Sequence, residues 1–388
     1  MYIFWYYINK NMATPTLSVR SLDINSSKDV DRFIKFAWQI YKNNPYWVPP
    51  LLMDIKKTIN PKNPFFEFAQ MQLFVAEQDG KIVGRIAAIK NDAHNRIHNE
   101  NAGHFGFFEC PDDQTIANTL FDTATDWCRK QGLNYIIGPA NPSINHEYGL
   151  LVNAFDDSPR LMMSYNPPYY KKLIENYGFT CIKGLNAYKL DQDTVLSNPK
   201  LLRISQLARE RTKVKIRSIN MKNLKQEVAL VKSLFNAAWE KNWGAIPMTD
   251  REIDDLAQAL KDIADPDLII FAEIDDKTVG FALAMRDYNY IFKQMNGRLF
   301  PFNFLKLFTQ KNKIEWVRIL LLGLLPDYRR TGLDAVLYHE IAIRARKFGI
   351  KYGEASWILE DNLPMVRAAE DVMTGECYKR YEVFGKNI

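Results

Sequence analysis

Closely spaced cysteines are missing from this sequence. Its 388 residues include four cysteines, and no two of them form a Cys-x-x-Cys pair. Structural zinc sites and disulfide-stabilised secreted domains depend on paired or abundant cysteines. We therefore expect neither a disulfide framework nor a metal site, and a reducing cytoplasm is the expected compartment.

Long hydrophobic runs are also missing. The longest aliphatic run, Ile319–Leu325, is far shorter than the roughly 20 residues that cross a bilayer. The apolar stretch Met1–Ile8 lacks the basic region and the small-residue cleavage site of a signal peptide. We expect residues 1–11 to be a disordered extension and any membrane contact to be peripheral, at the inner face.

A strong excess of either charge is absent. Lys and Arg (51) exceed Asp and Glu (45) by six, which is compatible with an anionic ligand but does not require one. Nucleic acid is therefore not an expected partner. The 47% of hydrophobic and 25% of charged residues are typical of a globular chain, and the length fits two domains. GxSxG, P-loop and GxGxxG motifs are absent.

Three histidines lie close together in the sequence. His94 and His98 have the spacing of two ligands on one helix face, and His104 follows them. No carboxylate or cysteine completes the set at ligand spacing. The pattern favours a solvated polar turn over a metal site.

The sequence does contain an internal repeat. Leu73–Gly84 matches Ile269–Gly280 at an offset of 196 residues, and both segments predict a β-hairpin. Two flanking landmarks recur in the same order: Ala37-Trp38 with Ala238-Trp239, and Arg129–Tyr135 with Arg346–Tyr352. Duplication explains three ordered matches better than chance does.

Each copy predicts the order strand, helix, hairpin, strand, helix, strand, helix, strand. The expected ranges in the first copy are 17–22, 28–42, 72–90, 104–109, 114–131, 133–138, 167–177 and 180–190. Those in the second copy are 214–219, 223–239, 268–286, 315–325, 333–348, 350–358, 363–373 and 378–384. We expect an α+β fold of two tandem domains, 12–195 and 214–388, joined by a basic linker, 196–213, each with a mixed, mostly antiparallel sheet flanked by helices.

The segment Arg318–Ala335 carries the most specific chemistry. An apolar strand ends at Pro326, a basic turn with Gly332 follows, and an amphipathic helix begins. The N-terminus of a helix presents free N–H groups and partial positive charge, which suit phosphates. Arg329 and Arg330 add positive charge to this turn.

This turn resembles the signature of the GNAT acyltransferase superfamily, Arg/Gln-x-x-Gly-x-Gly/Ala, which follows a strand and opens a helix. The sequence offers Arg329-x-x-Gly332-x-Asp334, with an acid in the third position that we expect to cap the helix instead. The resemblance implies two tandem GNAT-like domains and acyl-CoA, acetyl or longer, as co-substrate without a metal. The implied coenzyme-binding residues are Leu322, Gly323, Leu324, Arg329, Arg330, Thr331, Gly332, Leu333, Asp334 and Asn362.

Only the second copy carries such a turn. The corresponding stretch of the first copy, Gly106–Gln114, is acidic and lacks the matching glycine, so it would repel a pyrophosphate. We infer that the first copy has lost coenzyme binding and shapes the acceptor side. Myristoyltransferases and Fem-type enzymes divide tandem copies in a comparable way.

The acceptor side offers polar loops for catalysis and binding. His146 beside Glu147 could act as a general base, and Tyr378 is the candidate proton donor to the leaving thiol. An equally weighted alternative is that the loop around His146 is structural, held in place by hydrogen bonds from its own side chains to its backbone. The candidate substrate-binding residues are Asn141, Asn145, Tyr165, Asn166, Tyr169 and Tyr170, although Asn166–Tyr170 also reads as a helix start packed by aromatic residues.

The second copy gains an insertion at 291–313. This segment holds five Phe and five basic residues and no acid, which suits a membrane interface or a lid over a long acyl chain. The alternative is a hydrophobic arm packed between the two copies. A lid would favour a long acyl donor and a lipid amine as acceptor.

These features predict an acyl-CoA-dependent N-acyltransferase in which the amine attacks the thioester directly, without a covalent enzyme intermediate. A long-chain variant would be similar to the bacterial ceramide synthases. One alternative is a Fem-like transferase using aminoacyl-tRNA, supported by the eight basic residues and one acid of Lys200–Lys222. Another is a non-catalytic binding module, suggested by Asp334 and by the lack of a tyrosine at the usual helix position.

Overall fold

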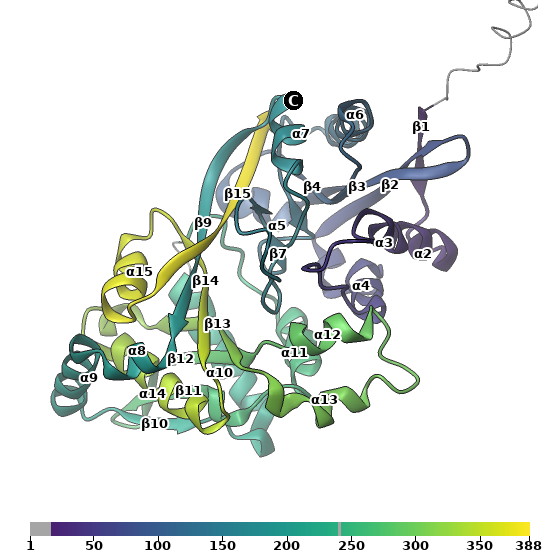
Figure 1. The fold of residues 1–388 in the computed structure, drawn as a ribbon. Coiled ribbons are helices and arrows are strands. Elements are labelled where there is room, and N and C mark those ends of the chain that lie inside the picture. Colours follow the sequence, from purple (N-terminus) through teal and green to yellow (C-terminus); the bar gives the residue numbers. More distant parts are fainter. Residues whose placement is uncertain (1–16, 240–241) are drawn as a thin grey trace, which may run out of the picture.

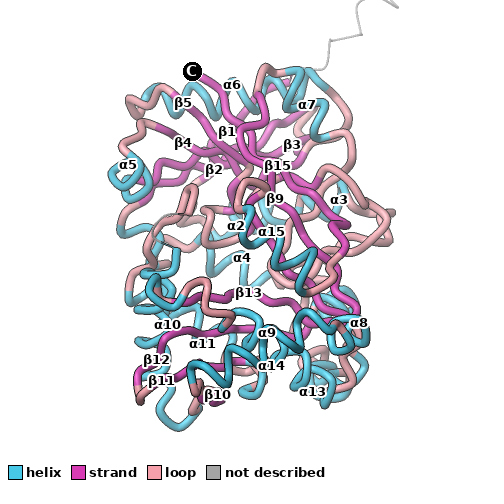
Figure 2. Tube along the Cα trace, turned by 90° about the vertical axis from the view of Figure 1, so that its left-hand side faces the viewer, coloured by secondary structure: helices cyan, strands magenta, loops and turns pink. Residues whose placement is uncertain are grey.

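The computed structural model describes residues 17–239 and 242–388 (Figure 1). The expected extension, residues 1–11, lies outside this part of the chain. Within the described part, the elements form a first half, residues 17–191, and a second half, residues 215–388. Figure 2 shows the strands of the two halves at opposite ends of the molecule, with two long strands running between them.

One continuous sheet of thirteen strands runs through the described residues. Its main path follows the order β1 (Leu17–Leu22), β2 (Ala69–Gln78), β3 (Lys81–Asn91), β4 (Ala102–Glu109), β5 (Tyr135–Gly138), β15 (Glu376–Asn387), β9 (Thr180–Asp191), β14 (Tyr352–Leu359), β13 (Trp316–Leu324), β12 (Lys277–Arg286), β11 (Ile269–Ile274) and β10 (Lys215–Ser218). The short β8 (Leu150–Leu151) pairs with β15, and β6 (Ala140–Asn141) pairs with β7 (Glu147–Tyr148) outside the sheet.

The pairing repeats in the two halves. In each half the hairpin leads into an antiparallel third strand, and that strand pairs in parallel with the next: β4 with β5, and β13 with β14. All the other pairs on the path are antiparallel. The predicted order of elements and the mixed, mostly antiparallel sheet are therefore confirmed.

The last strand of each half completes the sheet of the other half. β15, from the end of the chain, lies between β5 and β9 of the first half. β9, from the first half, lies between β14 and β15 of the second half. This exchange is why the sheet is continuous, and the sequence analysis did not anticipate it. The division of the chain at residue 195 stays a prediction.

Helices cover the sheet where their apolar faces match it. In α6, side chains at helical spacing, such as Ile116, Leu120 and Ala124, are buried, and Asp113 caps the first turn. The helices are α2 (Ser27–Lys35), α3 (Ala37–Ile40), α4 (Leu52–Ile59), α5 (Asp92–His98), α6 (Gln114–Lys130), α7 (Tyr170–Asn176), α8 (Gln192–Ser197), α9 (Pro199–Thr212), α10 (Leu224–Trp239), α11 (Asp250–Leu260), α12 (Asn289–Met295), α13 (Leu305–Thr309), α14 (Leu333–Lys347) and α15 (Leu363–Arg367).

The basic linker, residues 196–213, covers the end of α8 and the whole of α9, and α9 packs against α14. Leu201, Ser205 and Ala208 are buried on its inner face. Arg209 forms an ion pair with Glu340 of α14 at 2.8 Å, so its guanidinium is bound within the protein. Within the described residues, no helix combines the length and the apolar character needed to cross a membrane.

Candidate active site

The first feature of the site is the separation of β13 from β14. The two strands pair only from Trp316 to Ile319. Beyond this point β13 stays with β12, and β14 stays with β9. Leu320 has no partner in the register with β12, so a bulge marks the point of separation. Along Leu320–Leu324, β13 pairs with β12 on one side only. No described strand pairs with the main-chain N–H and C=O groups on its other side.

The open edge of β13 is lined by aliphatic side chains. Ile319–Leu322 are only partly buried. Ile319 and Leu322 contact a cluster that includes Tyr338 of α14 and Ile358 of β14. An apolar edge with free amide donors and acceptors can bind an extended molecule that itself carries amides, such as the pantetheine arm of coenzyme A.

The same separation occurs in the first half, but it is filled. β4 and β5 pair only from Ala102 to His104, and β4 then bulges at Phe107. The Oδ1 atom of Asn141 accepts the N–H of Phe107 at 2.6 Å. A side chain at Gly106 would collide with the carbonyl of Ala140. All of β4 is buried, so this edge has no room for a ligand.

The turn before α14 has the exposed basic residues that the sequence predicts. Arg329 and Arg330 are exposed, and the Arg329 guanidinium donates to the carbonyl of Ala238 at 3.0 Å. The Thr331 hydroxyl donates to the carbonyl of Tyr328, which tightens the turn. Gly332 has φ +85°, and a Cβ there would lie 3.1 Å from Ala208 of α9. Packing against α9 is thus one reason why the turn needs a glycine.

Asp334 stands at the start of α14, where Gly332 provides no side-chain cap. Burial raises the pKa of its carboxyl, and hydrogen bonds from the N–H groups of Ala335 and of Asp334 itself oppose this rise. The carboxylate is therefore held by main-chain amides at the start of α14. This acid is the one group of the turn that does not fit a diphosphate. Asn362 similarly caps α15, accepting the N–H of Met365.

The loop at residues 141–148 of the first half reaches the second half through Glu147, which feels the charge of Arg318 on β13. Burial raises the pKa of Glu147 to about 7, and a hydrogen bond from Asn141 and the positive charge of Arg318 oppose this rise. Asn141 thus serves both the filled edge of β4 and the Glu147 carboxylate. A carboxyl that titrates near neutral pH can accept a proton from an ammonium group.

The neighbours of Glu147 hold the loop in place. Burial lowers the pKa of His146 to about 4, so its ring is neutral at pH 7. Its Nδ1 atom lies 2.9 Å from the Ser143 hydroxyl. The Asn145 amide donates to the carbonyl of Ile246 at 3.3 Å and links the loop to the second half. Glu147, rather than His146, has the proton affinity of a base at neutral pH.

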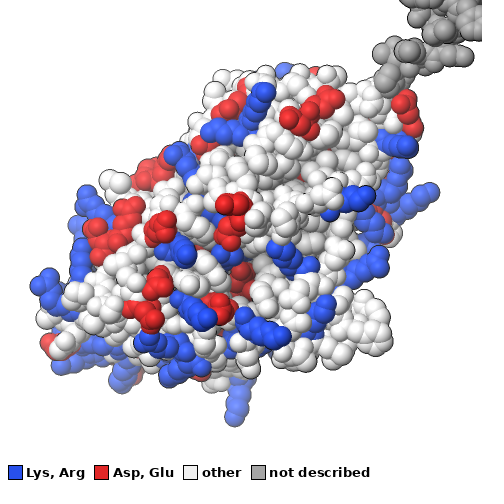
Figure 3. Space-filling view, viewed as in Figure 1, with Lys and Arg blue, Asp and Glu red and all other residues white. Residues whose placement is uncertain are grey.

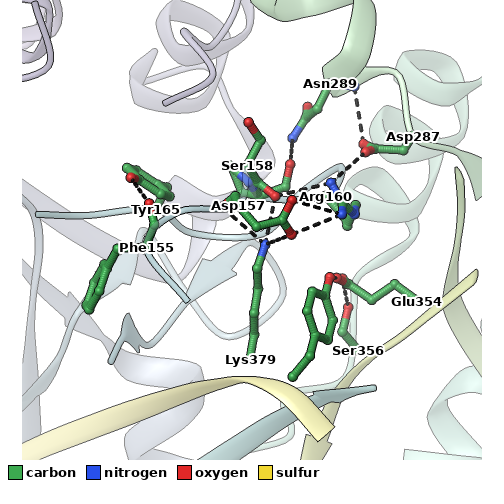
Figure 4. A network of polar contacts seen from close by, with 12 residues as sticks. Phe155, Asp157, Ser158, Arg160, Tyr165, Asp287, Asn289, Glu354, Ser356 and Lys379 are labelled. Atoms are coloured by element: carbon green, nitrogen blue, oxygen red, sulfur yellow. Dashed lines mark hydrogen bonds and ion pairs between the residues drawn. The ribbon is translucent and has the colours of Figure 1, made fainter. Parts of the chain in front are cut away.

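A largely buried ionic network joins the two halves (Figure 4). The Asp157 carboxylate lies between Arg160, at 3.0 Å, and Lys379, at 2.8 Å. Arg160 stacks on the ring of Trp316, 3.7 Å from its centroid, and lies 3.8 Å from Asp287. Burial raises the pKa of Asp287 to about 6.

The second part of this network surrounds Glu354. Arg318 on β13 donates to the Ser356 hydroxyl at 2.8 Å, and Ser356 donates to Glu354 at 2.5 Å. Tyr378 donates its hydroxyl proton to the other oxygen of Glu354. Burial, together with the charge of Glu354, raises the pKa of Tyr378 well above its usual value. Arg318 connects this network to Glu147.

Comparisons with known proteins identify relatives of the chain. The chain is 33% identical to protein YghO of Escherichia coli over 370 residues, covering 94% of both chains. It is also 33% identical to a bacterial ceramide synthase of Caulobacter vibrioides over 381 residues, covering 95% of this chain and 97% of that one. No family model matches the sequence.

Solved structures give the same fold. A tandem GNAT protein from the clavulanic acid biosynthesis pathway superposes with a TM-score of 0.58 at 12% identity, covering 96% of this chain and 98% of that chain. A GCN5-related N-acetyltransferase from Sphaerobacter thermophilus superposes with a TM-score of 0.52 at 11% identity, covering 96% and 95%. The chain belongs to the same family as protein YghO and the bacterial ceramide synthase. Its fold is the tandem GNAT fold.

Four residues that the sequence predicted to bind the acceptor form hydrogen bonds within the protein. Tyr165 donates to the carbonyl of Phe155 at 2.7 Å. The side-chain amide of Asn166 accepts the N–H of Leu151 through its oxygen and donates to the carbonyl of Leu151 through its nitrogen. Tyr169 donates to the carbonyl of Cys110, and the buried Tyr170 donates to Glu109 at 2.6 Å. These contacts match the alternative of a helix start packed by aromatic residues.

The sequence analysis missed the charged residues that this GNAT fold buries between its halves. Arg318 and Glu354 each interrupt an otherwise apolar strand, and both are buried. A charge inside an apolar strand is a readable signal, because it needs a buried partner. Its partner lies on another strand, however, and the sequence does not identify that strand.

The predicted histidine turn is not solvated, which corrects the sequence analysis. His94 and His104 are buried, and the His94 ring lies 4.7 Å from His98 and 4.8 Å from His104. His98 binds the carbonyl of Ala245 in the second half. The three rings therefore help to join the halves. Within the described residues, no group of side chains is arranged to hold a metal ion.

Proposed function

We propose that the protein transfers an acyl group from a coenzyme A thioester to an amine, with the second half holding the thioester and the first half holding the amine. The observation that supports this most directly is the open, aliphatic edge of β13 at Leu320–Leu324, set against the filled edge of β4. Within a GNAT fold, such an edge suits the amide-rich arm of the coenzyme.

In the proposed reaction, the Glu147 carboxylate takes a proton from the ammonium form of the acceptor. The amine nitrogen then attacks the thioester carbon and forms a C–N bond, and a main-chain N–H of the β13 edge stabilises the oxyanion. The C–S bond breaks as the tetrahedral intermediate collapses, the nitrogen releases its second proton to give the neutral amide, and the coenzyme thiolate leaves and takes up a proton. No covalent bond to the enzyme is needed.

The thiolate needs a proton as it leaves. We retain Tyr378 as the candidate, because it lies on β15 within the buried network at the junction of the halves. Its proton is held by Glu354, and its raised pKa makes it a weak acid. Solvent is an equally good source for this proton, since a thiolate needs little assistance to leave.

We further propose a long-chain acyl group and a lipid amine as the two substrates. The ceramide synthase relative supports this choice by its name, and Ile319–Leu322 supply an aliphatic lining beside the proposed thioester. The alternative use of aminoacyl-tRNA rests on the basic residues of the linker region, and several of these bind protein groups instead. Arg209 pairs with Glu340, and Arg217 pairs with Glu227.

The test is to follow thiol release and amide formation with purified protein, acyl-CoA donors of increasing chain length, and soluble and lipid amines. Arg329→Ala should raise the KM for acyl-CoA while leaving the fold intact. Arg96→Ala, an exposed arginine of the first half, is the matched control and should not change it. Absence of both thiol release and stabilisation by coenzyme A, with every donor, would refute the proposal.

A further inference from the structure

The insertion between β12 and β13 has one buried face and one exposed face. Ile291 and Met295 of α12 are buried in the core of the second half, and Leu299 and Leu307 pack against that core. This face matches the expected arm packed between the two copies, because it also contacts the first half: the Trp38 indole donates to the Asn296 side chain at 2.8 Å, and the N–H of Leu52 donates to the carbonyl of Gly297 at 3.0 Å. In Figure 1 the insertion, with α12 and α13, forms a corner of the molecule beside α4.

The opposite face exposes four large apolar side chains within nine residues. Phe300 is 65% exposed, Phe302 74%, Leu305 49% and Phe308 74%. Single exposed apolar residues are common on soluble proteins, but a cluster of large ones indicates a contact surface. We call Phe300, Phe302, Leu305 and Phe308 the insertion surface.

The charge beside the insertion surface is entirely positive along the segment. Residues 291–313 contain five basic residues and no acid. Lys293, Arg298 and Lys313 are exposed, whereas Lys311 pairs with the buried Asp265 at 2.7 Å. Figure 3 shows this corner uncharged at its outer edge, with Lys and Arg side chains beside it. Aromatic residues flanked by basic ones suit the headgroup region of an anionic bilayer.

The insertion surface is connected to the proposed active site. Asp287, two residues before α12, accepts the N–H of Leu161 at 2.9 Å, and Asn289 donates to the carbonyl of Pro159 at 2.9 Å. Lys293 donates to the Ser158 hydroxyl. These contacts belong to the same stretch as Asp157 and Arg160, so the orientation of the insertion is coupled to the buried network.

We propose that the insertion surface docks on the interfacial region of an anionic phospholipid bilayer, with Phe300, Phe302, Leu305 and Phe308 entering the boundary between headgroups and acyl chains. Arg298 and Lys313 contact the phosphates. The inference deepens the proposed transfer to a lipid amine and rests on it for its biological purpose. The docking itself is measured without catalysis.

The experiment is co-sedimentation of the full chain with vesicles of phosphatidylcholine alone and of phosphatidylcholine with phosphatidylglycerol. The wild type should bind the anionic vesicles at least tenfold better than the neutral ones. The variant F300S/F302S/F308S should lose at least tenfold in binding. The matched control L202S/L207S/I343S changes three apolar residues exposed on α9 and α14 and should bind like the wild type.

Two outcomes would overturn the inference. One is wild-type protein that stays in solution with anionic vesicles, and the other is equal loss of binding in the two triple variants. A dimer that the F300S/F302S/F308S variant abolishes, without any vesicle binding, would assign the surface to a second copy of the chain instead. Thiol release from acyl-CoA with a water-soluble amine, measured without vesicles, separates a failure of docking from a failure of the proposed function.

Discussion

The two halves of the molecule contain the same separated pair of strands and use it differently. In the second half, the edge of β13 at Leu320–Leu324 is open and partly exposed. In the first half, Asn141 and Ala140 fill the corresponding edge of β4, and the whole strand is buried. The comparison shows how a duplicated fold can keep its architecture while one copy fills with its own chain a strand edge that the other copy leaves open.

The loop that fills the first half also carries Glu147 toward the second. Asn141 binds Phe107 with its carbonyl oxygen and Glu147 with its amide. The Asn141 side chain therefore closes the edge of β4 and also holds the Glu147 carboxyl that we assign to the reaction at the edge of β13. This makes the difference between the halves part of the proposed mechanism.

The largest expected effect tests whether the first half supplies the base. Glu147→Gln should lower kcat/KM by about 100-fold or more, because general-base catalysis contributes roughly 10² to 10⁴ in rate. The carboxylate is the active form and the pKa is about 7, so the wild-type rate should rise with pH through neutrality. The variant should lose this rise. Steady-state kinetics between pH 5.5 and 9 measure both effects.

The control for this change is Glu376→Gln, which removes an exposed carboxylate at the start of β15. It should leave the pH profile unchanged. A Glu147→Gln variant that keeps the wild-type profile would move the base elsewhere.

The next effect tests the filled edge of the first half. Asn141→Ala leaves the N–H of Phe107 and the Glu147 carboxylate without this partner, and unsatisfied buried groups cost roughly 1–3 kcal/mol each. The free energy of unfolding, measured with urea, should fall accordingly. Calorimetry should still find one coenzyme A per chain, and a second bound coenzyme would contradict the difference between the halves.

A smaller effect tests the turn of the second half. Gly332→Ala should destabilise the protein by about 1–2 kcal/mol, because a left-handed backbone penalises a Cβ and this Cβ would lie 3.1 Å from both Ala208 and Ile204. Gly349→Ala has a similar φ of +74° but no atom within 4 Å of its Cβ. The difference between the two variants in thermal unfolding therefore measures the packing of α9 against the turn.

The smallest effect concerns the acid at the helix start. Asp334→Ala should tighten coenzyme A binding about threefold to tenfold, since a charge at a helix terminus contributes about 1 kcal/mol. The raised pKa of Asp334 also predicts tighter binding by the wild type as the pH falls and the carboxyl is neutralised. Titration calorimetry checks both. Asp327→Ala removes an exposed acid before the helix and should have less effect; weaker binding by Asp334→Ala would show that the acid assists the ligand.

Much of the fold could be predicted, because local patterns carry it. The strand at 17–22, the hairpins and the helix at 114–130 follow from alternation, turn residues and helical spacing. The candidate site was less accessible. Glu147 was found as a polar loop residue, but its preference over His146 depends on burial and on Arg318, which lies 171 positions away in the sequence.

By itself, the sequence determined that the chain is a duplicated α+β protein and that only its second copy has a basic turn with a glycine before a helix. These features depend on neighbouring residues, which the chain brings together without folding. Only the tertiary structure decided that β9 and β15 each pair with strands of the other half and that Arg318 contacts Glu354. It also decided that Asn141 fills the edge of β4 while the edge of β13 stays open. Such choices depend on which of several similar strands pack together, and that is settled by the burial and hydrogen bonding of the whole sheet.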